Sequence, residues 1–540
     1  MTNKDIAGLF HELASLMELH EENPFKIRSY ENAYLALRKL DEPLLELDRE
    51  AWMQIKGIGA TILDKLEEIQ SSGSFASLEE YRAKTPAGIR QILRIKGLGP
   101  KKVKTIWNEL KVESPGELLY ACYENRLVEL KGFGDKLQKE VIQSIEYFNS
   151  QQNLFLFAQL EGEAKILLEQ LHILNPQVRF EFTGSLRRAM PTLSCIELLT
   201  NANDFQLPEK LLNKEENYIW NELIPVTIYK TDSSQWAQEQ LRLTGGSEKF
   251  LQKFDSVLKN SHAVDEVSLF ESVKLPYIVP ECRDLEDYNS FDDKNLISEK
   301  DIKGVIHNHS NYSDGIYSIE QMAAECIRLG YSYFVISDHS KSAFYANGLQ
   351  EERLIKQWKE IDVLNEKLHP FKIYKSIESD ILSDGSLDYS DEILKKFDLV
   401  IASVHSNLKM DEEKAMNRLI KAIENPFTRI LGHPTGRLLL SRKGYPLRFK
   451  ELIDSCIANE VVMELNANPL RLDMDWTWIP YAMEKGLKVS INPDAHNLKG
   501  IRDIRYGVLS ARKGGLTKNN CLNTKSIAEF DLWIQSKNRF

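Results

Sequence analysis

The sequence predicts a multidomain protein with an all-α N-terminal region and a C-terminal barrel of parallel strands. A chain of 540 residues is long enough for three or more domains. A motif of one lysine and two glycines recurs three times in the first 150 residues, each time before an amphipathic helical stretch. From residue 300 on, seven short β-branched runs alternate with helical stretches. This alternation is typical of a parallel sheet closed or nearly closed into a barrel.

The repeated motif predicts the ligand of the N-terminal region. Its copies begin at Ile55, Ile95 and Leu130, and their glycines are Gly57, Gly59, Gly97, Gly99, Gly132 and Gly134. Paired glycines permit a tight turn and a close approach of a ligand to the backbone. The helix after each pair offers free N–H groups at its positive end, which suits a phosphate. We interpret the copies as helix–hairpin–helix motifs that bind a nucleic-acid backbone. A bare inter-helical turn is the alternative, and the repeated lysine argues against it.

The C-terminal region carries nine side chains that could bind metal ions, each shortly after an apolar run. They are His307, His309, Asp314, His339, Glu378, His405, His433, Asp494 and His496. In barrels of parallel strands, functional groups gather at the carboxyl ends of the strands, and every one of these residues falls there. A single histidine after a strand is more often structural, so the prediction depends on the whole set. Such a set suits two or three divalent ions, which activate water and neutralise the charge of a phosphate, and it predicts a metal-dependent phosphoesterase.

The composition excludes a membrane-spanning or disulfide-rich protein. The net charge is −11, so nucleic-acid binding would need a local basic face. The six cysteines are scattered and form no CxxC motif, which favours reduced thiols. The N-terminal stretch has the pattern of an amphipathic helix rather than of a signal peptide, and no apolar run reaches the ~18 residues of a membrane span. We therefore expect a cytoplasmic protein that does not contact membranes.

The C-terminal region resembles a known domain family. The segments HNHSNYSDG, SDHSKSAFYANGL, SIESDIL, FDLVIASVHS, ILGHPTGRLLL, MELNANP and INPDAH are similar to the PHP (polymerase and histidinol phosphatase) domain. SDHS followed by ANGL, and HPTGRLLL, are more similar to the PHP domain of bacterial family X DNA polymerases than to free-standing histidinol phosphatases. The resemblance covers residues 300–540 and implies a distorted (β/α)7 barrel with two or three divalent ions, Mn or Zn.

The resemblance also implies how the ligands divide. One ion would be held by His307, His309, Glu378 and Asp494, a second by Glu378, His405 and His433, and a third by Asp314, His339 and His496. Arg437 and Lys341 lie close after ligands and are candidates to clamp a phosphate. The alternative is that both are ordinary surface cations.

The first 80 residues resemble the lyase domain of family X polymerases. NPFKIRSYENAYLAL is similar to the segment that holds a 5′-phosphate, with Lys26 and Tyr30 at the phosphate-contacting positions. Lys65 falls where lyases of the family carry their Schiff-base lysine, although Thr61 occupies a position that is lysine in the animal repair enzyme. A lysine on an exposed helix face is usually just solvated, so lyase activity stays an open alternative.

The middle of the chain resembles the palm of the same polymerases, with one decisive departure. FTGSLRRAMPTLSCIELL is similar to the signature GSxRR followed by Gly–Asp–x–Asp, and a triphosphate would be cradled by Gly184, Ser185, Arg187 and Arg188. Cys195 and Glu197 stand in place of two metal-binding aspartates, and Thr227 in place of a third. Nucleotidyl transfer needs two Mg²⁺ ions held by oxygen anions. We therefore expect an α/β nucleotidyltransferase-like palm without polymerase chemistry.

These resemblances imply a division of the chain and a function. The expected segments are a lyase-type helical domain with the first hairpin (1–80), fingers with two hairpins (81–150), a degenerate palm (151–235), a thumb (236–285), a polar linker (285–301) and the PHP domain (300–540). We expect a monomeric DNA-repair nuclease that acts as a 3′–5′ exonuclease on gapped, nicked or 3′-ended DNA, with incision at abasic sites as a further option. The alternatives are a phosphomonoesterase of the histidinol-phosphatase type and a non-catalytic DNA-end-binding scaffold.

Overall fold

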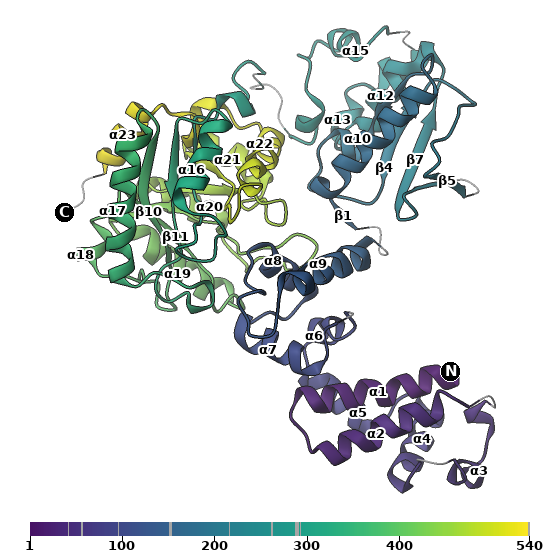
Figure 1. The fold of residues 1–540 in the computed structure, drawn as a ribbon. Coiled ribbons are helices and arrows are strands. Elements are labelled where there is room, and N and C mark those ends of the chain that lie inside the picture. The colour runs from purple at the N-terminus through teal and green to yellow at the C-terminus, as the bar shows by residue number, and fades with distance from the viewer. Residues whose placement is uncertain are drawn as a thin grey trace. The chain divides into compact units, whose positions relative to one another are not determined.

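The structure, a computed structural model, divides the chain into two compact units (Figure 1). The units are Met1–Glu146 and Tyr147–Phe540. The structure describes residues 1–40, 43–55, 58–95, 97–150, 154–214, 217–260, 263–286, 291 and 293–537. Over these residues, no helix combines the length and the apolar character needed to cross a membrane. The six cysteines are free thiols, as predicted.

The first unit is helical, as predicted. Its helices are α1 Asn3–Leu19, α2 Pro24–Leu37, α3 Arg49–Met53, α4 Ala60–Ser72, α5 Ala76–Lys84, α6 Ala87–Ile92, α7 Pro100–Leu110, α8 Pro115–Tyr123 and α9 Asp135–Ser150, the last of which runs past the unit boundary. Local sequence sets the helix starts: Thr2 caps α1 in a reciprocal pair with Asp5, and proline occupies the first turn of α2, α7 and α8. The apolar faces of α1, α2 and α4 form a common core.

The second unit begins with a mixed sheet in the segment for which a palm is predicted. Its strands follow the order β2-β4-β7-β6-β5, and only β4 and β7 pair in parallel. They are β2 Phe180–Phe182, β4 Ile196–Thr200, β5 Leu211–Lys214, β6 Asn217–Trp220 and β7 Ile224–Lys230, beside a small antiparallel pair of β1 Phe155–Leu156 and β3 Thr192–Leu193. Helix α10 (Phe157–Leu174) packs on this sheet, and the short α11 (Gly184–Arg187) follows β2.

A group of short helices follows the sheet. They are α12 Trp236–Thr244, α13 Glu248–Gln252, α14 Asp255–Asn260 and α15 Glu266–Ser272, and the rings of Phe250, Phe254 and Phe270 form their core. The segment predicted to be a polar linker is only partly one. Leu296 and Ile297 are buried, and Ile297 belongs to the core of the following barrel. These two apolar residues pack despite their polar surroundings in the sequence.

Within the described part of the chain, the barrel has seven parallel strands that are neighbours in sequence order, as predicted. They are β8 Gly304–Val305, β9 Tyr333–Ile336, β10 Lys372–Asp380, β11 Leu399–Ser403, β12 Thr428–Leu431, β13 Val462–Asn466 and β14 Val489–Asn492. The helices are α16 Ile319–Arg328, α17 Glu351–Leu368, α18 Asp391–Leu394, α19 Glu412–Glu424, α20 Phe449–Ala458, α21 Ile479–Glu484, α22 Ile504–Lys513 and α23 Ile527–Ser536. The strands are buried almost throughout, which explains why their sequences are continuous apolar runs rather than alternating ones.

The seam between the first and last strands is closed by a side chain. Among the described residues, β8 and β14 form no ladder with each other. Instead, the buried Asn523 donates from Nδ2 to the carbonyls of Gly304 at 3.1 Å and Ile491 at 2.8 Å. Its Oδ1 accepts the Ile491 N–H at 2.8 Å, and its carbonyl accepts the N–H of Lys303. Asn523 thus supplies hydrogen bonds between the two strands, and beyond their ends the His309 N–H donates directly to the Ala495 carbonyl at 2.9 Å.

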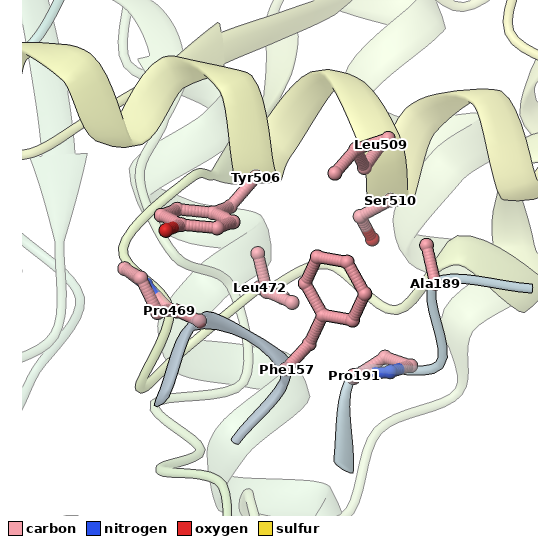
Figure 2. Close-up of a pocket in the computed structure, with 9 residues that line it drawn as sticks. Phe157, Ala189, Pro191, Pro469, Leu472, Tyr506, Leu509 and Ser510 are labelled. Carbon is pink, nitrogen blue, oxygen red and sulfur yellow. The ribbon is translucent and has the colours of Figure 1, made fainter. Parts of the chain in front are cut away.

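The mixed sheet and the barrel touch within the second unit through helix α22. In Figure 2 the ring of Phe157 lies beside Leu472 and below Ser510 and Leu509 of α22, with Tyr506 on the far side of Leu472. Ion pairs surround this apolar contact: Arg505 with Glu161, Arg512 with Glu281, and Lys513 with Asp284. Lys513 is fully buried, so its pairing with Asp284 is required for the contact to be stable.

Candidate metal centre

The nine predicted ligands converge at the carboxyl ends of the barrel strands. They are contributed by β8 and its loop, β9, β10, β11, β12 and β14 in turn: His307, His309 and Asp314; His339; Glu378; His405; His433; and Asp494 with His496. All are buried except His405, which is slightly exposed. His307 and Asp494 have φ of +64° and +52°, which residues other than glycine rarely adopt. Such strained backbone is typical of functional sites.

Glu378 lies at the middle of the cluster. Its Oε1 is 3.2 Å from Nε2 of His307, 3.1 Å from Nε2 of His405 and 3.0 Å from Nε2 of His433. Its Oε2 is 3.0 Å from Nδ1 of His339. A carboxylate with ligand atoms around both oxygens is placed to bridge two ions.

Two further carboxylates, Asp314 and Asp494, lie beside the remaining histidines. Asp314 lies 3.4 Å from both His339 and His496, and Asp494 lies 3.0 Å from His309. Ligand atoms within 4.8 Å of one another form four overlapping groups: His309, Asp314, His339 and His496; His307, His309 and Glu378; His307, His433 and Asp494; and His339, Glu378 and His405. The expected third set falls inside the first group. The expected second set is divided, because His405 and His433 fall in different groups although both contact Glu378.

The donor atoms fit divalent ions better than they fit one another. Nε2 of His307 and Nδ1 of His339 make no hydrogen bond, although each lies within 3.2 Å of a Glu378 oxygen. Two ligand atoms on one ion at about 2.1 Å would themselves lie about 3.4 Å apart, and both would point at the ion rather than at each other. Close contacts without hydrogen-bond alignment are therefore the pattern that a shared ion produces. Buried polar atoms without hydrogen bonds are otherwise costly.

Neighbouring charges and burial shift the pKa values of the ligand side chains. Burial alone would lower the pKa of His405, but the charges of Glu378 and Asp380 outweigh it and raise that pKa to about 9. Burial and the neighbouring His496 lower the pKa of His309 to about 4. Burial opposes ionisation of Glu378, but His405 and His307 outweigh it and hold the pKa of Glu378 well below its usual range. Metal ions would have to displace the protons on the raised histidines.

Three buried carboxylates that the sequence analysis missed support the ligands from behind. Glu464, in the middle of β13, lies 2.6 Å from Nδ1 of His307. Asp380 accepts from Nδ1 of His405. Asp338 accepts from Ser310, which adjoins His309. Such partners fix which ring nitrogen faces the metal and raise the basicity of the ligand. A buried acid inside an apolar strand run was the signal that could have identified Glu464.

The two predicted phosphate clamps differ in what surrounds them. Arg437 forms an ion pair with Asp475 and donates to the carbonyls of Arg471 and Leu472, so its guanidinium is already engaged. A phosphate would have to compete with these partners, and the clamp role of Arg437 stays a prediction. Lys341 lies 5.2 Å from the ring centre of Tyr389, and no ion pair with a carboxylate is seen in the described residues.

The residues of the predicted palm site lie together, and their polar groups contact one another within the protein. Glu197 and Thr227 are opposite each other on the parallel strands β4 and β7. Burial and the nearby Glu197 raise the pKa of the Cys195 thiol, which therefore stays neutral. Glu197 accepts the Ser185 N–H at 2.8 Å, and a Cβ at Gly184 (φ +60°) would lie 2.1 Å from its carboxylate. The carboxylate thus fills the space beside the predicted phosphate cradle.

Both arginines of the cradle are also paired within the chain. Arg187 forms a two-point ion pair with Glu266 at 3.1 and 2.6 Å. Arg188 pairs with Asp284 at 3.2 Å and donates to the Thr244 carbonyl at 3.0 Å. A triphosphate would have to displace these partners to use either cation.

The two glycines of each hairpin motif in the first unit have different roles. Gly97 and Gly132 have φ of +89°, so the first glycine of the pair makes the turn. A Cβ at Gly59, Gly99 or Gly134 would meet nothing within 4 Å, so the second glycine leaves open space at the helix start. Three predicted residues lie outside the described residues: Lys56, Gly57 and Lys96.

The lyase-type positions lie on two helices that share one aromatic pair. The ring of Phe10 stacks on Phe75 with centroids 5.2 Å apart. Tyr30, on α2, packs on the Phe10 ring at 6.4 Å, and Nζ of Lys65, on α4, lies 5.2 Å from the Phe75 ring centre. Lys26 is exposed on the first turn of α2. Lys65 therefore has a structural contact that accounts for its position without a reaction.

Comparison with protein families agrees with this architecture. Residues 1–75 match a helix-hairpin-helix domain, residues 89–146 a SAM-like helix-hairpin-helix tandem, and residues 306–468 the PHP domain. The barrel with its ligand cluster is thus a PHP domain, the mark of a family of metal-dependent phosphoesterases. The helix-hairpin-helix matches imply that the chain binds DNA.

Two relatives define the chain further. It is 32% identical to the DNA polymerase/3′-5′ exonuclease PolX of Bacillus subtilis over 99% of this chain and 100% of that protein. It is 26% identical to the probable phosphatase Teth514_1060 of Thermoanaerobacter sp. over 43% of this chain and 94% of that protein. The chain therefore belongs to the PolX family, and the phosphatases are similar to only part of it.

Proposed function

We propose that this protein is a metal-dependent DNA nuclease that removes nucleotides from 3′ ends and has no polymerase activity. The observation that carries the proposal is the complete set of nine converging ligands on a chain that also holds helix–hairpin–helix motifs. Its substrates are gapped, nicked or 3′-ended DNA, and its role is in DNA repair. The five segments 1–80, 81–150, 151–235, 236–285 and 300–540 act as the domains, and the protein works as a cytoplasmic monomer.

The cluster would hold two or three ions, Mn²⁺ or Zn²⁺, with Glu378 shared by two groups of ligands and Asp314 among the histidines of one group. Bound divalent ions lower the pKa of water and offset the charge of a phosphodiester. The protein's own contribution is orientation. Glu464 fixes His307 so that Nε2 faces Glu378, and Asp380 does the same for His405. The short φ-positive turns at His307 and Asp494 hold these ligands at fixed positions.

The palm supports the loss of synthesis. Two Mg²⁺ ions need several oxygen anions, whereas Glu197 stands between a neutral thiol and the Thr227 hydroxyl. Glu197 is also held by the Ser185 N–H, and the two arginines are paired with Glu266 and Asp284. The palm therefore acts as a structural part of the protein.

One experiment separates the nuclease from its two alternatives. The purified protein with Mn²⁺ is offered a labelled primer–template, single-stranded DNA and a phosphomonoester. Nucleotide release from the 3′ ends supports the proposal. Hydrolysis of the monoester alone indicates a histidinol-phosphatase type of enzyme, and binding of DNA ends without hydrolysis indicates a scaffold.

Variants then test the ligand set. His307→Ala, His339→Ala and His405→Ala should each lose nearly all nuclease activity while they stay folded, because ligands of a shared cluster act as a unit. His369→Ala removes an exposed histidine outside the cluster and should match the wild type. If His405→Ala kept most of its activity with Mn²⁺, the ligand assignment would be wrong.

A further inference from the structure

A cleft of about 420 Å³ opens at the same end of the barrel as the metal centre. It lies between the loop after β10 and the loop after β11, and its lining includes Ser383, Asp384, Asn407, Lys409, Lys414 and Arg418. Asn407 is two residues beyond the ligand His405, and Ser383 is three residues beyond Asp380. We call this the basic cleft. Its volume falls in the range of about 300–1,000 Å³ that is usual for ligand sites.

The basic cleft carries an excess of positive charge. Lys409, Lys414, Arg418 and Lys421 line it, against one lining carboxylate, that of Asp384, which pairs with Lys421 at 3.1 Å. Asp411, outside the lining, pairs with Lys414 at 3.3 Å. A local excess of cations stands out on a chain whose net charge is −11. Like charges close together repel, so their shared position favours an anionic ligand.

The guanidinium of Arg418 is the fixed element of the cleft. The residue is 3% exposed and donates to the carbonyls of Ile381, Leu382 and Ser406. Within the described residues it forms no ion pair with a carboxylate; the carbonyls that it binds solvate its charge, and the Asp380 carboxylate is a nearby negative charge. A buried cation of this kind raises the potential of the cleft that it lines.

The two walls of the cleft are tied together, so the cleft exists before a ligand arrives. Arg418 links the loop after β10 to the loop after β11 through the carbonyls that it binds. Asn407 (φ +54°) donates from Nδ2 to Ser383 Oγ at 2.8 Å. Lys421 donates to the carbonyl of Asp384 at 2.8 Å. A preformed site loses little entropy on binding.

We propose that the basic cleft binds the DNA strand that continues from the cleaved phosphate. The inference rests on the proposed nuclease function. It concerns the part of the bound strand that extends from the metal centre toward the loops after β10 and β11. The cations bind backbone phosphates, so the contact does not depend on sequence. A small phosphomonoester would end at the metal ions and would have no group to place in the cleft. The cleft therefore distinguishes a polynucleotide from a small substrate.

The test is a double charge reversal in the full chain, Lys409→Glu with Lys414→Glu. Lys414 is the third residue of α19, whose N-cap is Asp411, and an acidic residue is favourable there, so the fold should be kept. The measured quantity is kcat/KM for a single-stranded oligonucleotide divided by kcat/KM for bis(p-nitrophenyl) phosphate. This ratio should fall at least tenfold, mainly through KM for DNA. The slope of log affinity against log salt should drop by about 1.4, since each phosphate contact on a single strand contributes about 0.7.

The matched control is Lys356→Glu with Lys359→Glu, which makes the same change of charge on the exposed face of α17. An unchanged ratio in the cleft variant, or an equal fall in the control, overturns the proposal. A second arm does not need activity: an oligonucleotide that carries 4-thiothymidine is photo-crosslinked to the protein and the attached peptides are identified. Crosslinks within residues 404–424 support the basic cleft, and their absence overturns it. If the wild type hydrolyses neither substrate, the proposed function fails while the crosslinks still decide this inference.

Discussion

Replacing Glu464 by glutamine is the sharpest test of how the metal centre is built. The Glu464 carboxylate accepts four hydrogen bonds and faces only donors. One oxygen accepts from His307 Nδ1 at 2.6 Å and Asn492 Nδ2 at 2.7 Å, and the other from the His433 N–H at 3.0 Å and Asn466 Nδ2 at 3.1 Å. Glutamine has the same shape but must turn its NH₂ group toward one of these donor pairs. Two buried donors then lose their acceptor.

The expected magnitudes follow from this count. Each unsatisfied buried donor costs about 1–3 kcal/mol, so Glu464→Gln should lose about 2–6 kcal/mol of unfolding free energy. The loss of a carboxylate behind a ligating histidine typically weakens metal binding 10–100-fold, which is about 1.4–2.7 kcal/mol. Mn²⁺ titration followed by electron paramagnetic resonance gives the dissociation constants, and circular dichroism checks the fold.

Glu366 offers a control for the substitution of Glu464. Glu366→Gln makes the same chemical change on the exposed face of α17 and should leave both quantities unaltered. Excess Mn²⁺ should restore part of the nuclease activity of Glu464→Gln, because the ligands themselves are intact. A folded Glu464→Gln protein that binds Mn²⁺ as tightly as the wild type would refute the role of Glu464 in holding His307.

Three further predictions concern synthesis, pH and DNA. Template-directed incorporation of nucleotides should be absent with Mg²⁺ or Mn²⁺ in a His405→Ala background; incorporation would mean that acids such as Asp204 or Asp232 hold the ions. Because the pKa of metal-free His405 is about 9, Mn²⁺ must displace a proton from this residue below that pH. Titrations of the protein with Mn²⁺ from pH 6.5 to 9 should therefore show an affinity that rises about tenfold per pH unit for each proton displaced. An affinity that does not change with pH would contradict this prediction. Gly99→Val should weaken duplex binding in fluorescence anisotropy while the helix remains, because φ at Gly99 is −80° and its Cβ meets open space; undiminished affinity would remove that hairpin from the DNA contact.

The barrel and its ligands could be predicted from the sequence because both produce local sequence patterns. Each strand is a short apolar run, and each ligand follows such a run, as His405 follows LVIAS. Glu464 was not predicted as a site residue because it lies inside an apolar run, where its charge interrupts the apolar pattern without marking the end of the strand. The ion pair of Arg437 with Asp475 could not be predicted for a different reason, since closeness to a ligand in sequence does not tell which partner the guanidinium finds.

Contacts between distant segments were beyond the reach of the sequence. The pairing of the buried Lys513 with Asp284 joins residues 229 positions apart, and nothing local marks Lys513 as buried. The pairing of Arg188 with the same Asp284 is a further case, because GSLRR indicates a phosphate cradle rather than an internal ion pair. Such pairings depend on which faces of two separate cores meet, and no periodicity records that.

The side-chain seam at Asn523 has a consequence for how the protein is made. Asn523 joins β14 to Gly304, which was synthesised 219 residues earlier. The His309 N–H also donates to the Ala495 carbonyl at 2.9 Å, so until residues 495–523 have been synthesised, the first strand with His307 and His309 lacks these bonds to the last strand and the segment after it. A nascent chain therefore carries its histidines as a separated set, open to the wrong ions, for most of translation. Correct metal uptake must follow synthesis of the barrel rather than accompany it.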